Sequence, residues 1–375
     1  MYFLNGDRIY IKPEHGCGTL EEQIESCLLK LLEINSGKQI FKLNYFVDTT
    51  SQSDYLELQE KVTKRVSELF PDKIIQTFIA QPPLTCKIVV EAFYYDPSVW
   101  EKKPVGNGDC AAVFKNGEEQ ILIGNVQSKS GASCKTDSEL AFADLNSIFS
   151  ESGFEIRHII RQWNYLENIL GFDGEEQRYQ EFNNVRSEVY STSFNGTGYP
   201  AATGIGMNRG GVIIEFVAVK GRGFVSEAVD NPEQISAHNY SEKVLIGDEC
   251  ILKTTPKFER ARYFAYKDMK QIFISGTASI RGENTIGVDD PALQTEVTIE
   301  NIKNLYSEEV LKKLSDENLK PKYGHARVYV KNRKDFSVIR KTFKAHFANL
   351  PVVYIIADIC RKDLLVEIEG KVVLE

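Results

Sequence analysis

The sequence lacks several features that would direct it to particular partners. Its 375 residues contain no apolar run near the roughly 18 residues of a membrane span and no low-complexity tract. Lys and Arg number 45 against 53 Asp and Glu, so the formal net charge is −8. This balance argues against nucleic acid or an anionic membrane as the main partner. An acidic protein that binds an anion therefore needs a local cluster of Arg or Lys.

Metal and cofactor signatures are also missing. The seven cysteines contain no Cys-x-x-Cys pair, and the five histidines have no ligand-like spacing with cysteines or acids. The strand–GxGxxG–helix context of a nucleotide fingerprint is absent as well. We therefore expect no metal and no cofactor. The odd cysteine count, together with a start that lacks an export-signal pattern, predicts reduced thiols in a cytoplasmic protein.

Three regions of the chain resemble one another. The segments "KIVVEAFYY", "VIIEFVAVKG" and "LLVEIEGKVV" each contain an apolar run, a Glu and further apolar alternation. Aligning them on that acid sets Glu91, Glu215 and Glu367 in register. Upstream of each lie a β-type run, a helical segment and a strand marked by Pro, and hairpin-like pairs with a further helix come before these. In the first region the hairpin is expected around Asn5-Gly6.

This order, β-β-α-β-α-β-β three times over, predicts an α+β protein in which each copy is a small sheet with two helices on one face. Three such sheets would bury their uncovered faces if they packed about a pseudo-threefold axis as a pseudo-trimer. We expect the copies to span residues 1–96, 97–222 and 223–375, the first being degenerate. Ligand sites are expected in the clefts between copies. A chain that supplies three copies is expected to be a monomer or homodimer rather than an obligate trimer.

The last copy carries two acids, Glu367 and Glu369, on one strand. Period-2 alternation places both on the same face. In the first two copies the position two residues after the aligned acid is Phe93 or Val217, so we expect only one seam to carry the pair. The alternative is an ordinary amphipathic strand with its acids in water.

Several segments resemble a known family. The stretches "QIFISGTASIRGENTIG", "QTEVTIENIKNL" and "DLLVEIEG" are similar to the RidA/YjgF fold, which forms trimers of one-domain chains with active sites at subunit interfaces. The stretches "RQWNYLENI", "EQRYQEFNNVR" and "GYPAATGIGM" are similar to signature segments of a narrower group with three copies in one chain, the chorismatases (FkbO/Hyg5-like enzymes). The strong matches cover roughly residues 157 to 375.

The resemblance implies a cofactor-free enzyme that removes the enolpyruvyl side chain of chorismate as pyruvate. Such a vinyl ether breaks when a proton reaches its terminal methylene, so the general acid must stay protonated near neutral pH. Burial and a neighbouring carboxylate raise the pKa of a Glu above its ordinary value of about 4.3. By match to the family, Glu367 is the expected acid, with Glu369 as its neighbour or rival.

Substrate binding is expected mainly from the second copy. Arg binds the carboxylates of chorismate well because its planar fork is bidentate, although each Arg could equally be a surface residue or part of an ion pair. Glycines could let backbone N–H groups approach an anion. The candidates are Arg161, Tyr165, Arg178, Tyr179, Arg186, Thr203, Gly204, Gly206, Ala278 (or Ser279) and Arg327.

The ring product and two other functions stay open. Water addition after protonation would release a dihydroxycyclohexadiene carboxylate, whereas displacement by the ring hydroxyl would lead to a hydroxybenzoate. The presence of Cys360 is a point of resemblance to the hydroxybenzoate-forming members of the family. It favours 3-hydroxybenzoate as the product, unless Cys360 is a plain structural cysteine. A RidA-like deaminase acting on enamines or imines is disfavoured because Val353 stands where those proteins carry an Arg. A non-catalytic small-molecule binder is disfavoured by the acid pair and the clustered arginines.

Overall fold

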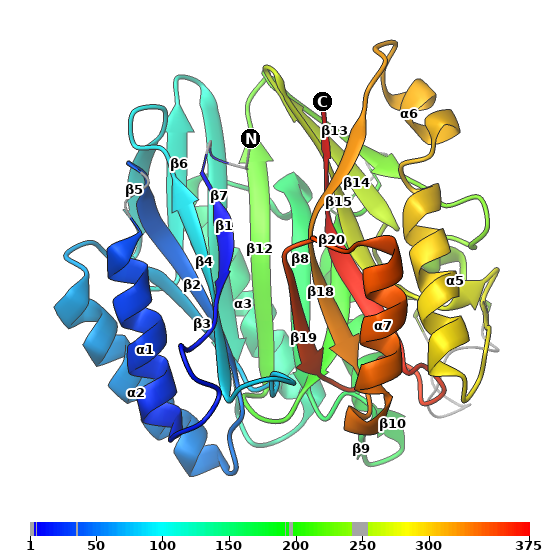
Figure 1. The fold of residues 1–375 in the computed structure, drawn as a ribbon. Helices are drawn as coiled ribbons and strands as arrows, with labels where there is room; N and C mark the ends of the chain where they lie inside the picture. Colours follow the sequence, from blue (N-terminus) through cyan, green and yellow to red (C-terminus); the bar gives the residue numbers. More distant parts are fainter. Residues whose placement is uncertain (1–3, 5, 35–36, 192, 195–197, 242–253) are drawn as a thin grey trace.

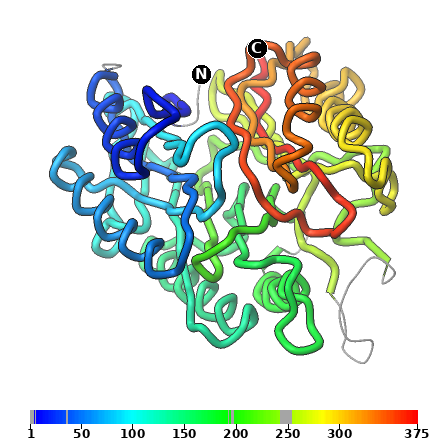
Figure 2. Tube along the Cα trace, turned by 60° about the horizontal axis from the view of Figure 1, so that its bottom comes forward, coloured from blue at the N-terminus to red at the C-terminus, as the bar shows by residue number. Residues whose placement is uncertain are grey.

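Three β-sheets, each with helices on its outer face, surround a common centre in the computed structural model (Figures 1 and 2). The structure describes residues 4, 6–34, 37–191, 193–194, 198–241 and 254–375. Within these residues no helix is long and apolar enough to cross a membrane.

The first sheet has four strands, in the spatial order β1 (Arg8–Ile11), β4 (Ile88–Tyr95), β2 (Gln39–Val47) and β3 (Ile75–Ile79). Helices α1 (Leu20–Glu33) and α2 (Gln52–Leu69) cover its outer face (Figure 1). The hairpin predicted around Asn5-Gly6 falls partly on Asn5, which lies outside the described residues. These elements form the first unit.

The second sheet has six strands, in the order β11 (Ala201–Met207), β8 (Ile159–Glu167), β12 (Val212–Lys220), β7 (Glu119–Ser128), β6 (Ala111–Asn116) and β5 (Glu101–Val105). Its helices are α3 (Cys134–Ser152) and α4 (Arg178–Tyr190), and the short strands β9 (Phe172–Asp173) and β10 (Glu176–Gln177) pair just before α4. These elements form the second unit.

The third sheet also has six strands, in the order β13 (Phe224–Val229), β14 (Ala261–Tyr266), β15 (Met269–Ala278), β20 (Val366–Leu374), β18 (Pro321–Val330) and β19 (Val352–Ile356). Its helices are α5 (Pro291–Asn304), α6 (Glu308–Leu314) and α7 (Phe336–His346), and the short strands β16 (Ile280–Arg281) and β17 (Asn284–Thr285) pair after β15. These elements form the third unit.

The three sheets share one topology. The orders β3-β2-β4-β1, β11-β8-β12-β7 and β19-β18-β20-β15 match strand for strand. In each unit the first and second strands of this order pair in parallel, and the second and third strands pair antiparallel. The predicted α+β fold built from three repeated units is therefore confirmed.

Local signals in the sequence start the helices. Thr19 caps α1, with its hydroxyl accepting from the Glu22 backbone N–H while the Glu22 carboxylate accepts from the Thr19 N–H. Ser51, Ser133 and Asp290 cap α2, α3 and α5 in the same general way. These caps satisfy backbone donors that the first helical turn leaves without partners.

The units are held together by a shared apolar core. Each unit buries one cluster between its sheet and its helices, and a fourth cluster lies where the inner faces of the three sheets meet. Phe46, Tyr165 and Tyr329 occupy equivalent positions in β2, β8 and β18, and all three are fully buried in this central cluster. A single sheet would leave that face in water, so the hydrophobic effect favours the three-sheet assembly.

A β-bulge in each unit fixes the alignment of the repeats and corrects one prediction. The bulges lie directly before Lys42, Arg161 and His325. With the bulges in register, Glu91 and Glu215 align with Glu369, and the predicted alignment with Glu367 is wrong by two residues. Period-2 alternation matches equally well after a shift of two, so the sequence pattern did not separate the two choices. Glu367 is then an acid at a position that is Val89 or Ile213 in the other units.

A substitution at Gly370 tests the close approach of β20 to β18. A Cβ on Gly370 would collide with the His325 carbonyl oxygen, whereas a Cβ on Gly324 would meet its nearest atom at 3.4 Å. We expect Gly370→Ala to lower the free energy of unfolding by about 2 kcal/mol, the usual cost of overpacking. Urea unfolding of this variant and of Gly324→Ala, the matched control, measures the difference. Equal stability of the two variants would contradict the packing described.

Candidate active site

A pocket lies between the second and third units. The second unit supplies side chains from the start of α4, and the third supplies side chains from β15, β20 and the segments before β14 and β20. The residues that matter below are Tyr179, Arg260, Gly276, Cys360, Arg361 and Glu367. The pocket lies at a seam between copies, the kind of place in which the sequence predicted a ligand site.

Glu367 on β20 lines this pocket with a carboxyl group that is almost fully buried (4% exposed). Burial and the neighbouring Glu369 carboxylate raise its pKa to about 8, and Arg161 opposes them only in part. A carboxyl group in such a setting keeps its proton at neutral pH. Glu367 can therefore donate a proton to a molecule in the pocket.

Gly276 makes room for that carboxyl group. The pairing of β15 with β20 shifts register between Ile274 and Thr277, so Gly276 lies in an irregular part of the strand. A Cβ on Gly276 would collide with Glu367 Oε1. Sequence reasoning missed this residue, although a glycine inside a strand was a signal for close approach.

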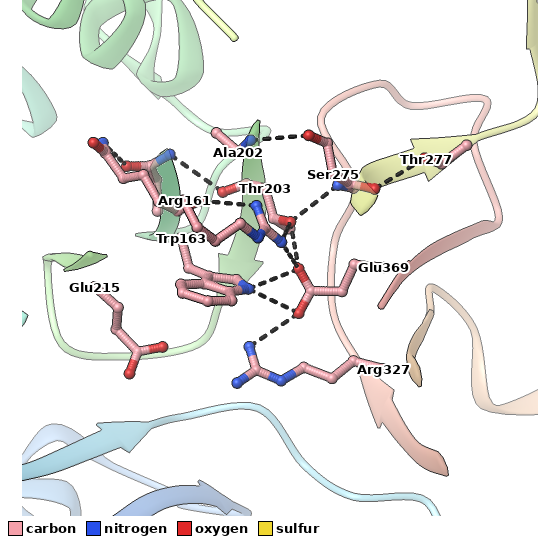
Figure 3. Close-up of polar contacts among 12 residues, drawn as sticks. Arg161, Trp163, Ala202, Thr203, Glu215, Ser275, Thr277, Arg327 and Glu369 are labelled. Atoms are coloured by element: carbon pink, nitrogen blue, oxygen red, sulfur yellow. Dashed lines mark hydrogen bonds and ion pairs between the residues drawn. The ribbon is translucent and has the colours of Figure 1, made fainter. Parts of the chain in front are cut away.

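Glu369, two residues further on, is held in a different environment (Figure 3). Its carboxylate accepts from Trp163 Nε1 at 2.8 and 3.0 Å and from Arg327 Nη1 at 3.0 Å, and it forms an ion pair with Arg161 at 2.5 Å. Burial alone would raise the pKa of Glu369, but Arg327, Arg161 and the Thr203 hydroxyl outweigh it and lower the pKa. Glu369 is therefore a fixed anion, and its neighbour Glu367 is a neutral acid.

The equivalent acids of the other units are also ion-paired at the centre. Glu215 contacts Lys42 and accepts from Tyr165 Oη at 2.8 Å, and Glu91 accepts from Arg327 Nη2 at 2.5 Å. The pair Lys42–Glu215 joins the first and second units as Arg161–Glu369 joins the second and third. We call these three acids and their basic partners the central network.

Two arginines missed by sequence reasoning reach the pocket. The guanidinium carbons of Arg260 and Arg361 lie 5.3 and 5.2 Å from the centre of the Tyr240 ring. Arg260 Nη2 donates to Tyr240 Oη and to a backbone carbonyl, both at 2.6 Å, and Arg361 Nη1 donates to the Glu283 carbonyl at 2.7 Å. Within the described residues neither forms an ion pair, so both have charge to offer an anion. The sequence could have indicated Arg361, because it lies in the same short segment as the two acids. No sequence motif marks Arg260.

The pocket contains only some of the predicted site residues. Besides Glu367, it includes Tyr179, Ala278 and Cys360, whereas Ser279 Oγ donates to a backbone carbonyl. Burial raises the pKa of the Cys360 thiol to about 12, with Glu367 adding to the effect, so this side chain is a neutral part of the wall. Burial likewise raises the pKa of the Tyr179 phenol.

The structure places most of the other candidates in supporting positions. Arg161, Arg327 and Glu369 belong to the central network, and the hydroxyls of Tyr165 and Thr203 are hydrogen-bonded to it. None of these five is among the described residues that line the pocket, but the Thr203 hydroxyl accepts at 3.0 Å from the N–H of Gly276, which does line it. Their role at the site is to hold and charge its wall.

The remaining candidates are structural in this arrangement. Arg178 forms an ion pair with Asp173 at 2.8 Å, and the Gly206 N–H donates to the Asp358 carbonyl at 2.8 Å. Gly204 packs closely against the Tyr179 ring. Arg186 donates at 2.7 Å to Asn183 Oδ1, and Asn183 lines the pocket, so Arg186 lies one residue behind the wall.

A neutral carboxyl group and two arginines in one pocket can together bind an anionic small molecule and donate a proton to it. Comparison with known proteins gives a family. A protein-family model with the description "Chorismatase FkbO/Hyg5-like, N-terminal" matches residues 98–218 of this chain. A 3-hydroxybenzoate synthase of Streptomyces hygroscopicus is 30% identical over 244 residues, which are 62% of this chain and 68% of that protein.

Further relatives agree. A protein named chorismatase from Streptomyces hygroscopicus is 28% identical over 281 residues, 73% of this chain and 78% of that protein. A crystal structure of a chorismatase shares the fold with a TM-score of 0.70, covering 98% of both chains at 22% identity. The chain therefore belongs to the FkbO/Hyg5-like chorismatase family of enzymes, as its sequence motifs predicted.

The raised pKa of Glu367 has a measurable effect on stability. The folded state keeps the proton up to about pH 8, whereas the unfolded chain loses it near 4.5, so ionisation favours unfolding as pH rises between these values. Glu367→Gln removes this cost. We expect its free energy of unfolding, relative to the unsubstituted protein, to rise by about 3 kcal/mol between about pH 5 and about pH 7.5.

Urea unfolding at the two pH values measures this change. Glu57→Gln, on the exposed face of α2, is the matched control and should change stability by no more than about 0.5 kcal/mol at either pH. A stability difference for Glu367→Gln that does not vary with pH would show that Glu367 is ionised in the folded state.

Proposed function

We propose that this enzyme converts chorismate, and that Glu367 is the general acid that protonates the enolpyruvyl side chain and so releases it as pyruvate. One observation carries the proposal: a buried carboxyl group, with its pKa raised to about 8, lines a pocket that also contains two arginines. The names of the relatives, chorismatase and 3-hydroxybenzoate synthase, support the choice of substrate.

The first step transfers the Glu367 proton to the terminal methylene of the vinyl ether. A methyl group and an oxocarbenium ion form, and Glu367 becomes an anion. Water that adds to the oxocarbenium carbon would give a hemiketal, which releases pyruvate and the ring alcohol; the ring hydroxyl would instead attack the ring carbon that bears the ether and break its C–O bond, so that the side chain leaves as pyruvate. A buried anion beside the fixed charge of Glu369 is costly, so Glu367 regains a proton readily from the attacking water or hydroxyl. The two acids thus keep separate roles, one as proton donor and the other as a permanent negative charge.

The two carboxylates of chorismate need cationic partners inside the pocket. Arg260 and Arg361 are the arginines that line it, and their guanidinium groups keep donors beyond those bound to backbone carbonyls and Tyr240. We assign substrate binding to these two residues in place of Arg161, Arg178 and Arg327, which are engaged by carboxylates of the protein.

The three units span residues 1–96, 97–222 and 223–375 in this proposal, and a single chain completes the site. Monomer and homodimer are therefore both compatible with activity. The equivalents of Glu367 in the other units are Val89 and Ile213, so the two other seams have no corresponding acid.

For the ring product we propose 3-hydroxybenzoate. Cys360 lines the pocket beside Glu367, and its neutral thiol fills space that water would otherwise occupy. Excluding water favours displacement by the ring hydroxyl over addition of water. The 30% identical relative is named 3-hydroxybenzoate synthase, which supports this choice.

Turnover of chorismate tests the proposed acid. We expect Glu367→Gln to lower kcat by about a thousandfold, within the range for loss of a general acid. Since the acid must be protonated, kcat/KM of the unsubstituted enzyme should fall above about pH 8 as Glu367 ionises. Pyruvate release is followed by coupled NADH oxidation with lactate dehydrogenase.

Glu300→Gln, which removes an exposed partner of Arg281, is the control and should keep full activity. Unchanged pyruvate release by Glu367→Gln would show that Glu367 is not the general acid. If no pyruvate is released from chorismate between about pH 5 and about pH 8, the proposed function is wrong.

Chromatography of the ring product tests the outcome of the second step. We expect 3-hydroxybenzoate from the unsubstituted enzyme and an increased share of dihydroxycyclohexadiene carboxylate from Cys360→Ala, because the smaller side chain admits water. A dihydroxycyclohexadiene carboxylate as the main product of the unsubstituted enzyme would contradict the proposal.

A further inference from the structure

The pocket of Glu367 has two chemically different walls. The third unit supplies the acid itself and the guanidinium groups of Arg260 and Arg361. Among the described residues, the second unit supplies four polar side chains without charge at neutral pH, which we call the α4 wall: Gln177, Tyr179, Gln180 and Asn183. A molecule in the pocket therefore meets cations on one side and neutral hydrogen-bonding groups on the other.

Three side chains of the α4 wall are amides, and their contacts distinguish them. Gln180 Nε2 donates to Asn184 Oδ1 and to the Thr254 carbonyl, both at 2.9 Å, so both of its N–H groups are engaged. Within the described part of the chain, Gln177 Nε2 is buried without a hydrogen-bond partner, so no such bond sets the direction of its N–H groups. Asn183 is the amide that a neighbouring side chain orients.

Arg186 orients the Asn183 amide. Its Nη2 donates to Asn183 Oδ1 at 2.7 Å, and both side chains are almost fully buried. Because Arg has donors and no acceptor, the oxygen of Asn183 faces Arg186 and the nitrogen faces away from it. A hydrogen bond from Asn183 also opposes the rise in the pKa of the Tyr179 phenol that burial causes. The Asn183 nitrogen therefore lies on the side of Tyr179 and the pocket.

Arg186 has no second partner that would explain its burial. Among the described residues it forms no ion pair, and its Nε has no hydrogen-bond partner. Its guanidinium carbon lies 5.3 Å from the centre of the Phe182 ring. A buried arginine that serves stability alone is usually paired with an acid, as Arg178 is with Asp173. The contact with Asn183 is therefore the task that these surroundings indicate for Arg186.

The proposed substrate has one polar substituent left for the α4 wall. Its two carboxylates need the guanidinium groups, and its vinyl ether must reach Glu367, so the ring hydroxyl remains. A hydroxyl both donates and accepts hydrogen bonds, as amides and a phenol also do between them. A carboxylate matches this wall less well than it matches the arginines, because the wall offers no charge.

We propose that Asn183 recognises the ring hydroxyl of the substrate by donating an amide N–H to it, and that Arg186 is the positioning residue that holds this amide in the required direction. The inference rests on the proposed function. It implies that the enzyme selects ligands that carry the hydroxyl, since without it a buried donor is left unpaired. The same contact fixes the hydroxyl oxygen in place for attack on the ring carbon that bears the ether.

A pair of inert ligands tests this selectivity in the unsubstituted enzyme. Both are analogues of chorismate in which a saturated lactyl ether replaces the enolpyruvyl group, so neither has a vinyl ether to protonate. One keeps the ring hydroxyl, and the other carries hydrogen in its place. We expect calorimetry to show at least about tenfold tighter binding of the hydroxylated ligand. In Asn183→Leu this ratio should fall to about threefold or less, whereas a general distortion of the pocket would weaken both ligands alike.

Arg186 variants test the positioning role. Arg186→Met frees the amide and should also lower the ratio to about threefold or less, whereas Arg186→Lys keeps a cationic donor and should retain most of it. Asn146→Leu, on the exposed face of α3, is the control and should leave the ratio unchanged. Circular dichroism confirms that each variant folds.

The outcomes separate this inference from the proposed function. Equal binding of the two ligands by the unsubstituted enzyme, or an unchanged ratio in Asn183→Leu, would overturn the role of Asn183. An unchanged ratio in Arg186→Met would overturn the role of Arg186. Failure of the enzyme to bind the hydroxylated ligand would also overturn the inference, and the proposed function falls with it only if chorismate releases no pyruvate.

Discussion

The buried ion pairs of Glu369 with Arg161 and Arg327 are the interaction on which the site depends. They join strand β8 of the second unit to strands β18 and β20 of the third, and all three side chains are almost inaccessible to solvent. Removing one partner of such a group leaves an uncompensated buried charge, which is strongly destabilising. The geometry of the seam and the charge beside Glu367 are therefore fixed by the same contacts.

This arrangement also explains how two acids on one strand take different roles. Glu369 is surrounded by donors, so it stays ionised in spite of its burial. Glu367 faces the pocket, and within the described residues no hydrogen bond stabilises its charged form. The anion next to it makes a second negative charge unfavourable. Separated pKa values in neighbouring carboxyl groups are the usual basis for a division between proton donor and fixed charge.

The repeated architecture gives the molecule both symmetry and specialisation. The pairs Lys42–Glu215 and Arg161–Glu369 are equivalent contacts between successive units, and they hold the three sheets about the centre. Against this symmetric background, one unit alone has Glu367 in place of the apolar residues Val89 and Ile213. A single seam could thus acquire proton-transfer chemistry while the other contacts continued to serve stability.

The sequence by itself determined the triplicate α+β pattern, the family and the strand that carries the acids, because periodicity, order of elements and motifs are local properties. Tertiary structure decided which acid keeps its proton, since the charges around Glu369 come from Arg161 and Arg327 on other strands. It also decided the true register of the repeats and the arginines of the pocket. Arg260 and Arg361 lie about a hundred residues apart in the chain and meet only because the third unit folds both segments against Tyr240.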